Sequence, residues 1–441
     1  MTQAGSAIVR PSHPSASTAV AIVGGGIAGM GAALSLAQAG MDVTIFESEA
    51  ELGGNCFGID VSTGGTSRCR VDAGVSDFNI DSFVRLRALL DDLGVAHAPI
   101  CQDASFAPVG GVASLYTSGG VVRGPVAAEV ADEITRFGRE CVDVLEDENW
   151  RGRSVLDYVR TRNHSDTFAK NYLYPRVIGC FSAPDDNPES LAIRSIVGFW
   201  KMHRLVGEGP ARRHAVVGGM HAYCDALQRR LVQLGVRIRC RTRVLAVRRN
   251  PGGVELHTRG DAKTEHDRSL ADHVIFATPP NLVADLLEDA SGTERLGFAG
   301  VPFQRARVVV HRDSAVLPRN REAWGAYNYV VPCGQAPRVR PTITFFPSRI
   351  MPTGDDATDV LVSLNPTVEP RANSVLAQRW VVHPMAGAAA TRAATRIESM
   401  QGERNTWHCG SYLREPFLHE QALASGQDVA ARLLGRAAIA A

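Results

Sequence analysis

The stretch AVAIVGGGIAGMGAALSLAQAG, residues 19–40, decides the fold. Its first five residues are apolar and partly β-branched, which is typical of a buried parallel strand. Three glycines, Gly24, Gly26 and Gly29, follow with the spacing G-x-G-x-x-G. Small and apolar residues then recur at helical intervals as far as Gly40, where the helix is predicted to end. The pattern therefore predicts a strand, a tight turn and a helix in immediate succession.

A second predicted strand, residues 41–46, ends at Glu47, which follows Gly24 by 23 residues. In a nucleotide-binding unit, Gly24 permits the turn and Gly26 lets the backbone approach a pyrophosphate at the helix N-terminus. Gly29 allows the helix and strand to pack closely, and the Glu47 carboxylate accepts hydrogen bonds from ribose hydroxyls. The alternative is a tight turn between two buried elements. The combination favours a nucleotide cradle, and the carboxylate disfavours NADP.

The residues after Glu47 indicate which dinucleotide is bound. Ser48 follows directly, and Gly53, Gly54 and Asn55 come soon after it. Two alternating runs around a second Gly-Gly pair then predict a β-hairpin. This arrangement resembles the extended FAD fingerprint of the glutathione-reductase-like flavoproteins, in which a Gly-Gly pair lies against the pyrophosphate. The resemblance implies FAD as the cofactor, and we expect it to be bound without a covalent link.

Two distant segments extend this resemblance. Strands around a Pro-Gly-Gly turn include Val244, whose equivalent meets the adenine through its backbone, and a later apolar strand ends at Ala277 and Thr278. Near the C-terminus, TWHCGSYLREPFLHEQAL predicts a strand, a glycine turn and a helix, and the resemblance implies that this helix N-terminus lies against the flavin. The cofactor-binding candidates are Gly24, Gly26, Ile27, Ala28, Gly29, Glu47, Ser48, Gly53, Gly54, Asn55, Val244, Ala277, Thr278, Gly410, Ser411, Leu418 and His419.

The order of these motifs resembles the flavin-containing amine oxidase superfamily. Within it, the chain is most similar to a bacterial group described as predicted NAD/FAD-binding proteins, through VDAGVSDFN, WGAYNY, SLNP and WHCGSY. The resemblance implies an α/β fold in which a Rossmann-like FAD-binding domain is interleaved with an α+β substrate domain. The implied boundaries are 19–76, 211–298 and 396–441 for the FAD-binding domain, and 77–210 and 299–395 for the substrate-binding domain.

Composition excludes several other functions. The 47 basic and 46 acidic residues give a formal net charge of +1, which argues against nucleic acid as a partner. The nine cysteines show neither zinc-ligand spacing nor a disulfide framework, so we expect reduced thiols, no metal and a cytoplasmic protein. Residues 1–18 are rich in Ser, Pro and Ala and are expected to form a disordered tail. No window approaches the roughly 20 apolar residues of a membrane span, and the oligomeric state is not predicted.

Flavin amine oxidases usually place a lysine near the reactive N5 atom of the flavin and two aromatic rings around the amine. Here Arg307 stands where the resemblance sets that lysine, and the two ring positions correspond to His383 and Leu418. An arginine stays cationic, so it binds a carboxylate or orients water but does not act as a base near neutral pH. The broken aromatic cage disfavours a simple primary monoamine as the substrate.

His383, His419 and Asn328 complete the catalytic candidates besides Arg307. His383 would serve as an acid or base if it faces the flavin, and the alternative is a structural histidine. His419 begins the last predicted helix and either shields the flavin edge or caps the helix. Asn328 either contacts the substrate or packs within a strand. Cys409 raises the question of a covalent flavin link, but we interpret it as structural.

These features predict an FAD-dependent oxidoreductase that removes hydride from a C–N or activated C–H carbon. The expected substrate is a small apolar organic molecule, either lipid-like or a secondary metabolite, with O2 as the electron acceptor. One alternative is redox-neutral isomerisation of a double bond, which some relatives with this fold perform. Another is a non-catalytic, FAD-bound partner protein.

Overall fold

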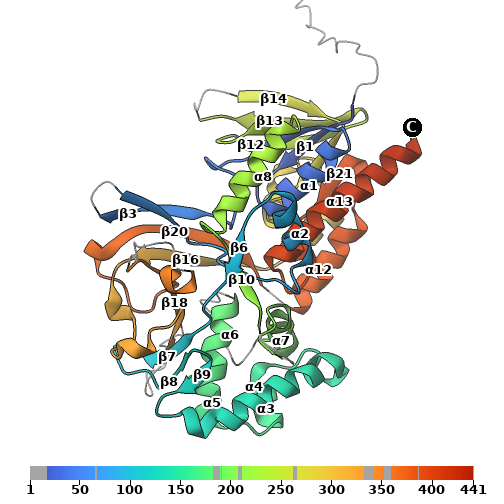
Figure 1. Cartoon of the computed structure of the whole chain (residues 1–441). Coiled ribbons are helices and arrows are strands. Elements are labelled where there is room, and N and C mark those ends of the chain that lie inside the picture. The colour runs from blue at the N-terminus through green and yellow to red at the C-terminus, as the bar shows by residue number, and fades with distance from the viewer. Residues whose placement is uncertain are drawn as a thin grey trace, which may run out of the picture.

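A five-stranded parallel sheet organises one part of the molecule (Figure 1). The structure, a computed structural model, describes residues 17–64, 67–181, 189, 191–206, 211–261, 266–331, 342–351, 359–385 and 387–440. The parallel sheet has the order β11-β2-β1-β15-β21. Its strands are β1 (Ala19–Val23), β2 (Asp42–Phe46), β11 (Arg237–Arg239), β15 (His273–Phe276) and β21 (Thr406–His408). Strand β1 is therefore central, and the glycine turn that follows it lies at the carboxyl edge of the sheet.

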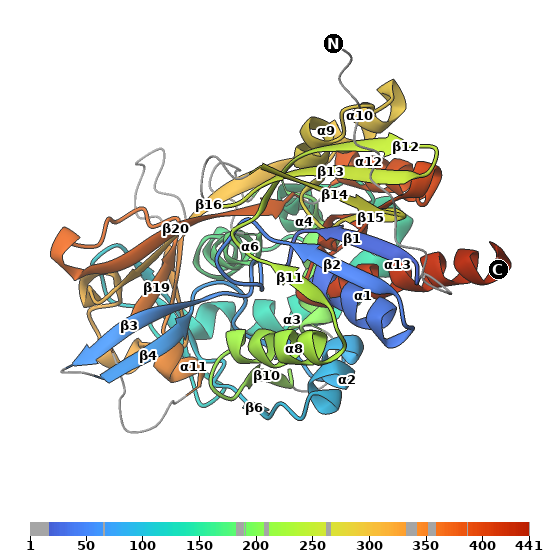
Figure 2. The ribbon, with the colours of Figure 1, turned by 90° about the horizontal axis from the view of Figure 1, so that it is seen from above.

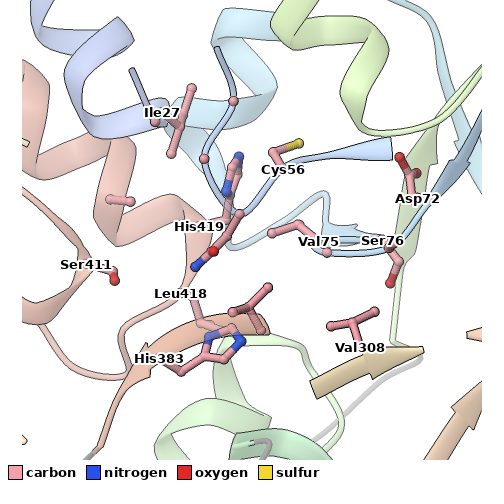
Figure 3. Close-up of a pocket in the computed structure, with 18 of the residues that line it drawn as sticks. Ile27, Cys56, Asp72, Val75, Ser76, Val308, His383, Ser411, Leu418 and His419 are labelled. Carbon is pink, nitrogen blue, oxygen red and sulfur yellow. The ribbon is translucent and has the colours of Figure 1, made fainter. Parts of the chain in front are cut away.

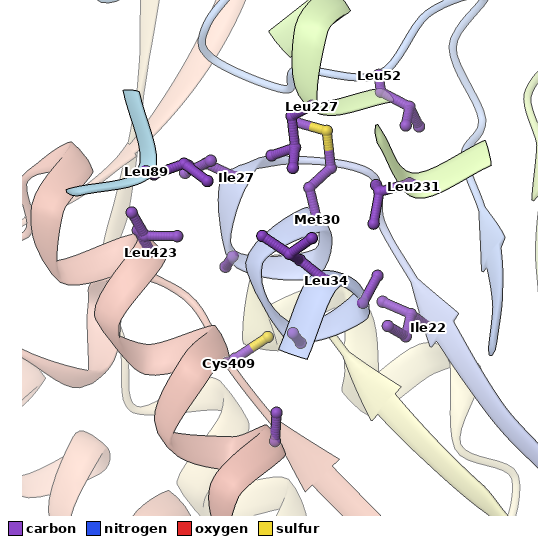
Figure 4. Close-up of a cluster of buried hydrophobic side chains, with 14 of the residues drawn as sticks. Ile22, Ile27, Met30, Leu34, Leu52, Leu89, Leu227, Leu231, Cys409 and Leu423 are labelled. Atoms are coloured by element: carbon purple, nitrogen blue, oxygen red, sulfur yellow. The ribbon is translucent and has the colours of Figure 1, made fainter. Parts of the chain in front are cut away.

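Three helices cover one face of this sheet. They are α1 (Ile27–Gln38), α8 (His221–Gln233) and α13 (His419–Ala440). Val20 and Ile22 of β1 pack beneath them, whereas Ala21 and Val23 point to the opposite face. Successive side chains of a strand alternate between the two faces of the sheet. Figure 4 shows the core between the helices and the sheet, with Cys409 among its apolar side chains.

The opposite face of the parallel sheet packs against a second, antiparallel sheet and a group of helices. The strands of that sheet are β12 (Arg243–Asn250), β13 (Gly253–Arg259) and β14 (His266–Ala271). The helices are α9 (Pro280–Leu286), α10 (Gly292–Ala299) and α12 (Ala388–Ser399). Their apolar side chains form one buried cluster with Val23 and Phe276 of the parallel sheet. The parallel sheet is thus covered on both faces, as a buried parallel sheet requires.

An eight-stranded sheet forms the second large part, with the order β20-β16-β19-β18-β17-β7-β8-β9. Its strands are β7 (Ala104–Pro108), β8 (Leu115–Ser118), β9 (Val121–Arg123), β16 (Phe303–His311), β17 (Tyr327–Val331), β18 (Thr342–Phe345), β19 (Leu361–Leu364) and β20 (Val375–Pro384). Neighbours are antiparallel except for β17 and β7, which are parallel. Figure 2 shows β16 and β20 extending from this sheet toward the parallel sheet.

Helices and a hairpin complete the second part. One group of helices shares a buried cluster with Phe106 and Ile343 of the eight-stranded sheet, and comprises α3 (Ala127–Glu146), α4 (Val155–Thr161), α5 (Asp166–Phe168), α6 (Tyr174–Phe181) and α7 (Ile193–Met202). The hairpin of strands β3 (Gly58–Gly64) and β4 (Ser67–Asp72) packs on the other end of the sheet. Val61 and Val308 belong to one buried cluster there. The remaining elements are β5 (Phe78–Asn79), β6 (His97–Pro99), β10 (Arg213–Val216), α2 (Val84–Asp92) and α11 (Pro347–Ile350).

This architecture confirms the predicted α/β fold class. Strand β1 has the predicted bounds, and β2 begins at Asp42, one residue later than predicted. Most of the predicted tail, residues 1–16, lies outside the described residues, and so does Gly65 of the hairpin turn. The domain boundaries stay predictions. None of the described helices is both long enough and apolar enough to cross a membrane.

Candidate active site

One large cavity lies between the five-stranded parallel sheet and the eight-stranded sheet. Its volume is about 1130 Å³, and its lining runs from the glycine turn after β1 to strands β17 and β18 of the eight-stranded sheet. Figure 3 shows part of the cavity, where Ser76, Val308, His383 and His419 surround one space. Pockets for a single drug-sized molecule are usually of about 300–1,000 Å³, so this cavity is at the upper limit or above it.

The glycine turn forms one end of the cavity. Gly24 has φ +108°, and a Cβ there would lie 2.8 Å from the carbonyl oxygen of Ala277. At Gly29 a Cβ would lie 2.1 Å from the carbonyl oxygen of Gly24, so helix α1 and β1 pack too closely for a side chain. Gly26 differs, because a Cβ there would meet only the Cα of Gly54, at 3.9 Å. The protein itself leaves this space open at the N-terminus of α1, in the place where a pyrophosphate is predicted.

The second glycine pair lies directly against the first turn. Gly53 and Gly26 form an isolated parallel bridge, and the Gly53 N–H donates to the Gly25 carbonyl at 2.9 Å. Gly54 has φ +59°, which favours glycine. These residues line the cavity together with Ile27, Ala28, Ser48 and Asn55. Gly29 is the one member of this predicted set outside the lining, since its role is to pack helix on strand.

Glu47 places a buried carboxylate beside the turn. Only 8% of the residue is exposed, and its Oε2 accepts the Gly25 N–H at 2.7 Å. Its Oε1 accepts the Glu49 N–H at 2.8 Å and lies 3.3 Å from the Ser48 hydroxyl. An ionised carboxylate has about four lone-pair sites, so Glu47 keeps acceptor capacity toward the cavity that it lines.

Thr278 carries a buried polar atom that the protein leaves unsatisfied. Its Oγ1 has no hydrogen-bond partner among the described residues, although the residue lines the cavity after β15. Ala277 beside it donates its N–H to the Val23 carbonyl at 2.8 Å, and Val244 lines the cavity where β12 breaks its register with β13. An orphaned hydroxyl, an open glycine and a buried carboxylate are what a dinucleotide's phosphates and ribose would use. The residues present therefore fit FAD.

The C-terminal segment supplies a further wall. Gly410 has φ +155° and donates its N–H to the Ser425 hydroxyl at 2.8 Å. Ser411, Leu418 and His419 line the cavity, and His419 begins α13 (Figure 3). The positive end of the α13 dipole therefore lies beside the cavity. A helix N-terminus stabilises negative charge, as reduction of a flavin requires.

Two histidines of the predicted set face the cavity. His383 comes from the end of β20, and burial lowers its pKa to about 4. His419 forms a hydrogen bond with the Tyr223 hydroxyl, and burial lowers its pKa to about 4 as well. Both rings are therefore neutral at neutral pH. The structure brings them to the same cavity from distant parts of the chain.

Arg307 is placed differently from the expectation. It lies on β16 but does not line the cavity, and its guanidinium forms an ion pair with Glu369. The backbone N–H of Arg307 donates to Asn365 Oδ1 at 2.7 Å. The next residue of this strand, Val308, does line the cavity (Figure 3). Successive side chains of a strand point to opposite faces, so Arg307 and Val308 face different sides of β16, and a role of Arg307 beside the flavin stays a prediction.

Asn328 also lies away from the cavity, for the same reason. Its side chain is buried and accepts from the Ser105 hydroxyl at 2.8 Å and the Gly325 N–H at 3.0 Å. It donates to the Gly325 carbonyl at 2.8 Å. The structure therefore favours the strand-packing alternative, and its neighbours Tyr327 and Tyr329 line the cavity instead.

Asp77, Arg213 and Tyr327 form a buried cluster that the sequence reasoning missed. Arg213 Nε and Nη2 donate to Asp77 Oδ1 at 2.8 and 2.5 Å, and the Tyr327 hydroxyl donates to Oδ2 at 3.0 Å. The guanidinium also lies 4.8 Å from the centre of the Tyr327 ring. Burial opposes ionisation of Asp77, but Arg213 outweighs it and the pKa is lowered. Because 136 residues separate Asp77 from Arg213, no local spacing signals the pair.

The cysteines and lysines limit the chemistry further. Cys409 is fully buried outside the cavity lining, and burial raises the pKa of its thiol to about 12 (Figure 4). Cys56 does line the cavity, buried beside Cys224.

Of the chain's lysines, Lys170 and Lys201 are described, and neither lines the cavity. No group of His, Cys, Asp and Glu among the described residues is arranged to hold a metal ion.

Comparisons with known proteins agree with this geometry. The model of a family described as flavin containing amine oxidoreductase matches residues 27–301. Putrescine oxidase, solved with putrescine bound, superimposes with a TM-score of 0.66 at 17% identity, covering 96% of this chain and 100% of that one. Cyclohexylamine oxidase from Brevibacterium oxydans IH-35A gives 0.67 at 14%, covering 96% and 99%. A CLA-producing fatty acid isomerase from P. acnes gives 0.63 at 14%, covering 94% and 98%. At these low identities, the three comparisons show that this chain shares the fold of those proteins.

Proposed function

The chain belongs to the flavin-containing amine oxidoreductase family and is an FAD-dependent oxidoreductase, and from this premise we propose its reaction. It removes hydride from a C–N or activated C–H carbon of an apolar, lipid-like or secondary-metabolite molecule, and O2 accepts the electrons. FAD is bound without a covalent link. The observation that carries the proposal is a single cavity joining a nucleotide cradle to a wall of apolar and aromatic residues.

FAD would be held mainly by backbone and by small side chains. The open space at Gly26 and the N-terminus of α1 would take the pyrophosphate, and Glu47 would accept from ribose hydroxyls. Thr278 Oγ1 would gain the partner that the protein does not supply. Cys409 is fully buried and does not line the cavity, although its neighbour Gly410 does, which supports a non-covalent cofactor.

When bound, FAD supplies an acceptor for hydride. The protein's own part is to hold the substrate in a dry space and to leave its reacting carbon unhindered. Val308, Tyr327 and Tyr329 provide apolar and aromatic walls. His383, neutral at pH 7, keeps one ring nitrogen able to accept a hydrogen bond from the substrate. With no described lysine at the cavity, and with His383 and Leu418 in place of two Phe, Tyr or Trp rings, a primary monoamine is the less suitable substrate.

Stopped-flow spectroscopy of the purified protein tests this reaction. With a true substrate, anaerobic mixing should bleach the flavin stoichiometrically, and air should restore its absorbance. Conversion of substrate without net bleaching would instead establish the isomerase, and binding with neither effect would establish a non-catalytic protein. Acid precipitation should release the flavin into the supernatant, and flavin that stays with the precipitate would contradict the non-covalent link.

A further inference from the structure

The wall opposite the flavin cradle contains polar groups that the proposed reaction does not use. Arg213, on β10, spends two of its donor nitrogens on Asp77. Its Nη1 has no hydrogen-bond partner among the described residues, although the residue lines the cavity. Only 12% of the Arg213 side chain is exposed. Nη1 is not one of the fully buried unsatisfied atoms, so it is open to the cavity, where a ligand can supply the acceptor that the protein does not.

His203 is a second unsatisfied group at the same wall. The residue is only 7% exposed, lines the cavity, and has a buried Nδ1 with no partner among the described residues. Its backbone carbonyl accepts from Asn79 at 3.2 Å, and Asn79 is the register partner of Arg213 between β5 and β10. The two unsatisfied side chains therefore belong to one compact piece of structure.

Arg204 adds a charge at the same place. It follows His203 directly, lines the cavity and is exposed, and no described residue accepts a hydrogen bond from its side chain. The nearby carboxylate of Asp77 is already occupied, because it accepts a hydrogen bond from the Arg213 guanidinium and forms an ion pair with it. Cationic donors without a carboxylate acceptor suit an anionic oxygen ligand, since such charge-assisted hydrogen bonds are the strong ones.

We propose that the substrate carries an anionic oxygen head group, a carboxylate or a phosphate, which binds at Arg213, His203 and Arg204. This inference rests on the proposed function and narrows its substrate class. The apolar body of the molecule then extends along Tyr327 and Tyr329 toward Val308. An ammonium head group finds no unpaired carboxylate among the described residues of this wall, so cationic amines bind poorly.

Titration of the flavin-loaded protein with matched ten-carbon probes tests the proposal, with binding heat as the readout. Decanoate and decyl phosphate carry the two anionic heads, decanol is neutral and decylamine is cationic. At least one anion should bind about tenfold or more tightly than decanol, and the tighter anion identifies the head group. Decylamine should bind most weakly.

Arg204→Gln sharpens the test, because the exposed side chain is not needed for folding. It should weaken binding of the preferred anion about tenfold and leave decanol unchanged. Arg229→Gln is the matched control, since Arg229 is also exposed but lies on α8 outside the cavity lining. His203→Phe should weaken the anion in the same selective way.

Two results would overturn the inference. If decanol or decylamine binds as tightly as both anions, the proposed head-group site is contradicted, but the apolar cavity of the proposed function is not. Failure of every probe, decanol included, would instead remove the apolar substrate of the proposed function and the head-group site together. Equal losses for decanol and the anion in Arg204→Gln would also contradict a charge-specific contact.

Discussion

The glycine turn and the wall of the eight-stranded sheet line the same cavity by different means. The turn uses backbone, with Gly24, Gly26 and Gly54 allowing close approach. The wall uses side chains on alternate positions of strands, so that Val308 faces the cavity and its neighbour Arg307 does not. A backbone site depends on glycine spacing alone, whereas a side-chain wall depends on which face each strand presents.

The largest expected effect separates the two glycines of the turn. Gly26→Val should leave the fold intact, since a Cβ there meets nothing closer than 3.9 Å, but should block the pyrophosphate and lower FAD affinity by a hundredfold or more. Flavin absorbance of the purified variant measures the occupancy. Gly29→Ala is the control, because its Cβ would lie 2.1 Å from the Gly24 carbonyl oxygen. It should lower the stability of folding by about 1–3 kcal/mol instead. Normal flavin content in the purified Gly26→Val variant would contradict the predicted pyrophosphate site at Gly26.

A second test compares a buried ion pair of the wall with an exposed one. Asp77→Asn leaves the Arg213 charge uncompensated in a site where the two side chains are 6% and 12% exposed. It should reduce the free energy of unfolding by about 3–5 kcal/mol. Glu369→Gln removes the exposed partner of Arg307 and should change it by about 0–1 kcal/mol. Urea unfolding measures both variants, and similar shifts would contradict the distinction.

A third test uses the pH dependence of stability and a buried histidine of the parallel sheet, on strand β21. His408 is 1% exposed, and burial lowers its pKa to about 4 from an ordinary 6.5. As pH falls below 6.5, the unfolded chain takes up this proton before the folded one, so stability is lost between pH 6.5 and about 4. His408→Phe should remove about 2 kcal/mol of that loss at pH 5.

His383 is the matched site in the cavity wall, and its pKa is lowered to about 4 in the same way. Because the two pKa values are lowered equally, His383→Phe should flatten the pH dependence of stability about as much as His408→Phe does, although the His383 ring faces the cavity. Urea unfolding at pH 7 and pH 5 gives both values. A larger effect at His383 would mean that the cavity is drier than the core.

The smallest expected effect is at Arg307. Since its guanidinium pairs with Glu369 on the face away from the cavity, Arg307→Ala should change the rate of flavin reduction by no more than about twofold. Val308→Phe, one residue later, projects into the cavity and should slow reduction about tenfold or more by displacing the substrate. Stopped-flow traces compare the pair. A large loss in Arg307→Ala alone would restore the original assignment of this residue to the site.

Local signals made the nucleotide end of the cavity predictable. The bounds of β1, the glycines of the turn and the position of Glu47 lie within about 30 residues of one another, so their spacing carries the geometry. Thr278 and His419 were placed by resemblance to known flavoproteins, and both line the cavity. The catalytic candidates Arg307 and Asn328 were not predictable in this way, because a strand pattern defines alternation but not which set faces inward.

By itself, the sequence determined the strand–turn–helix start, the α/β class and the glycines that leave room for a dinucleotide, because each depends on neighbours a few residues apart. The tertiary structure alone decided that Val308 faces the cavity, and that Asp77 and Arg213 form a buried pair across 136 residues. The physical reason is that side-chain facing and long-range charge pairing depend on how sheets pack. That packing is a property of the whole chain and leaves no trace in local spacing.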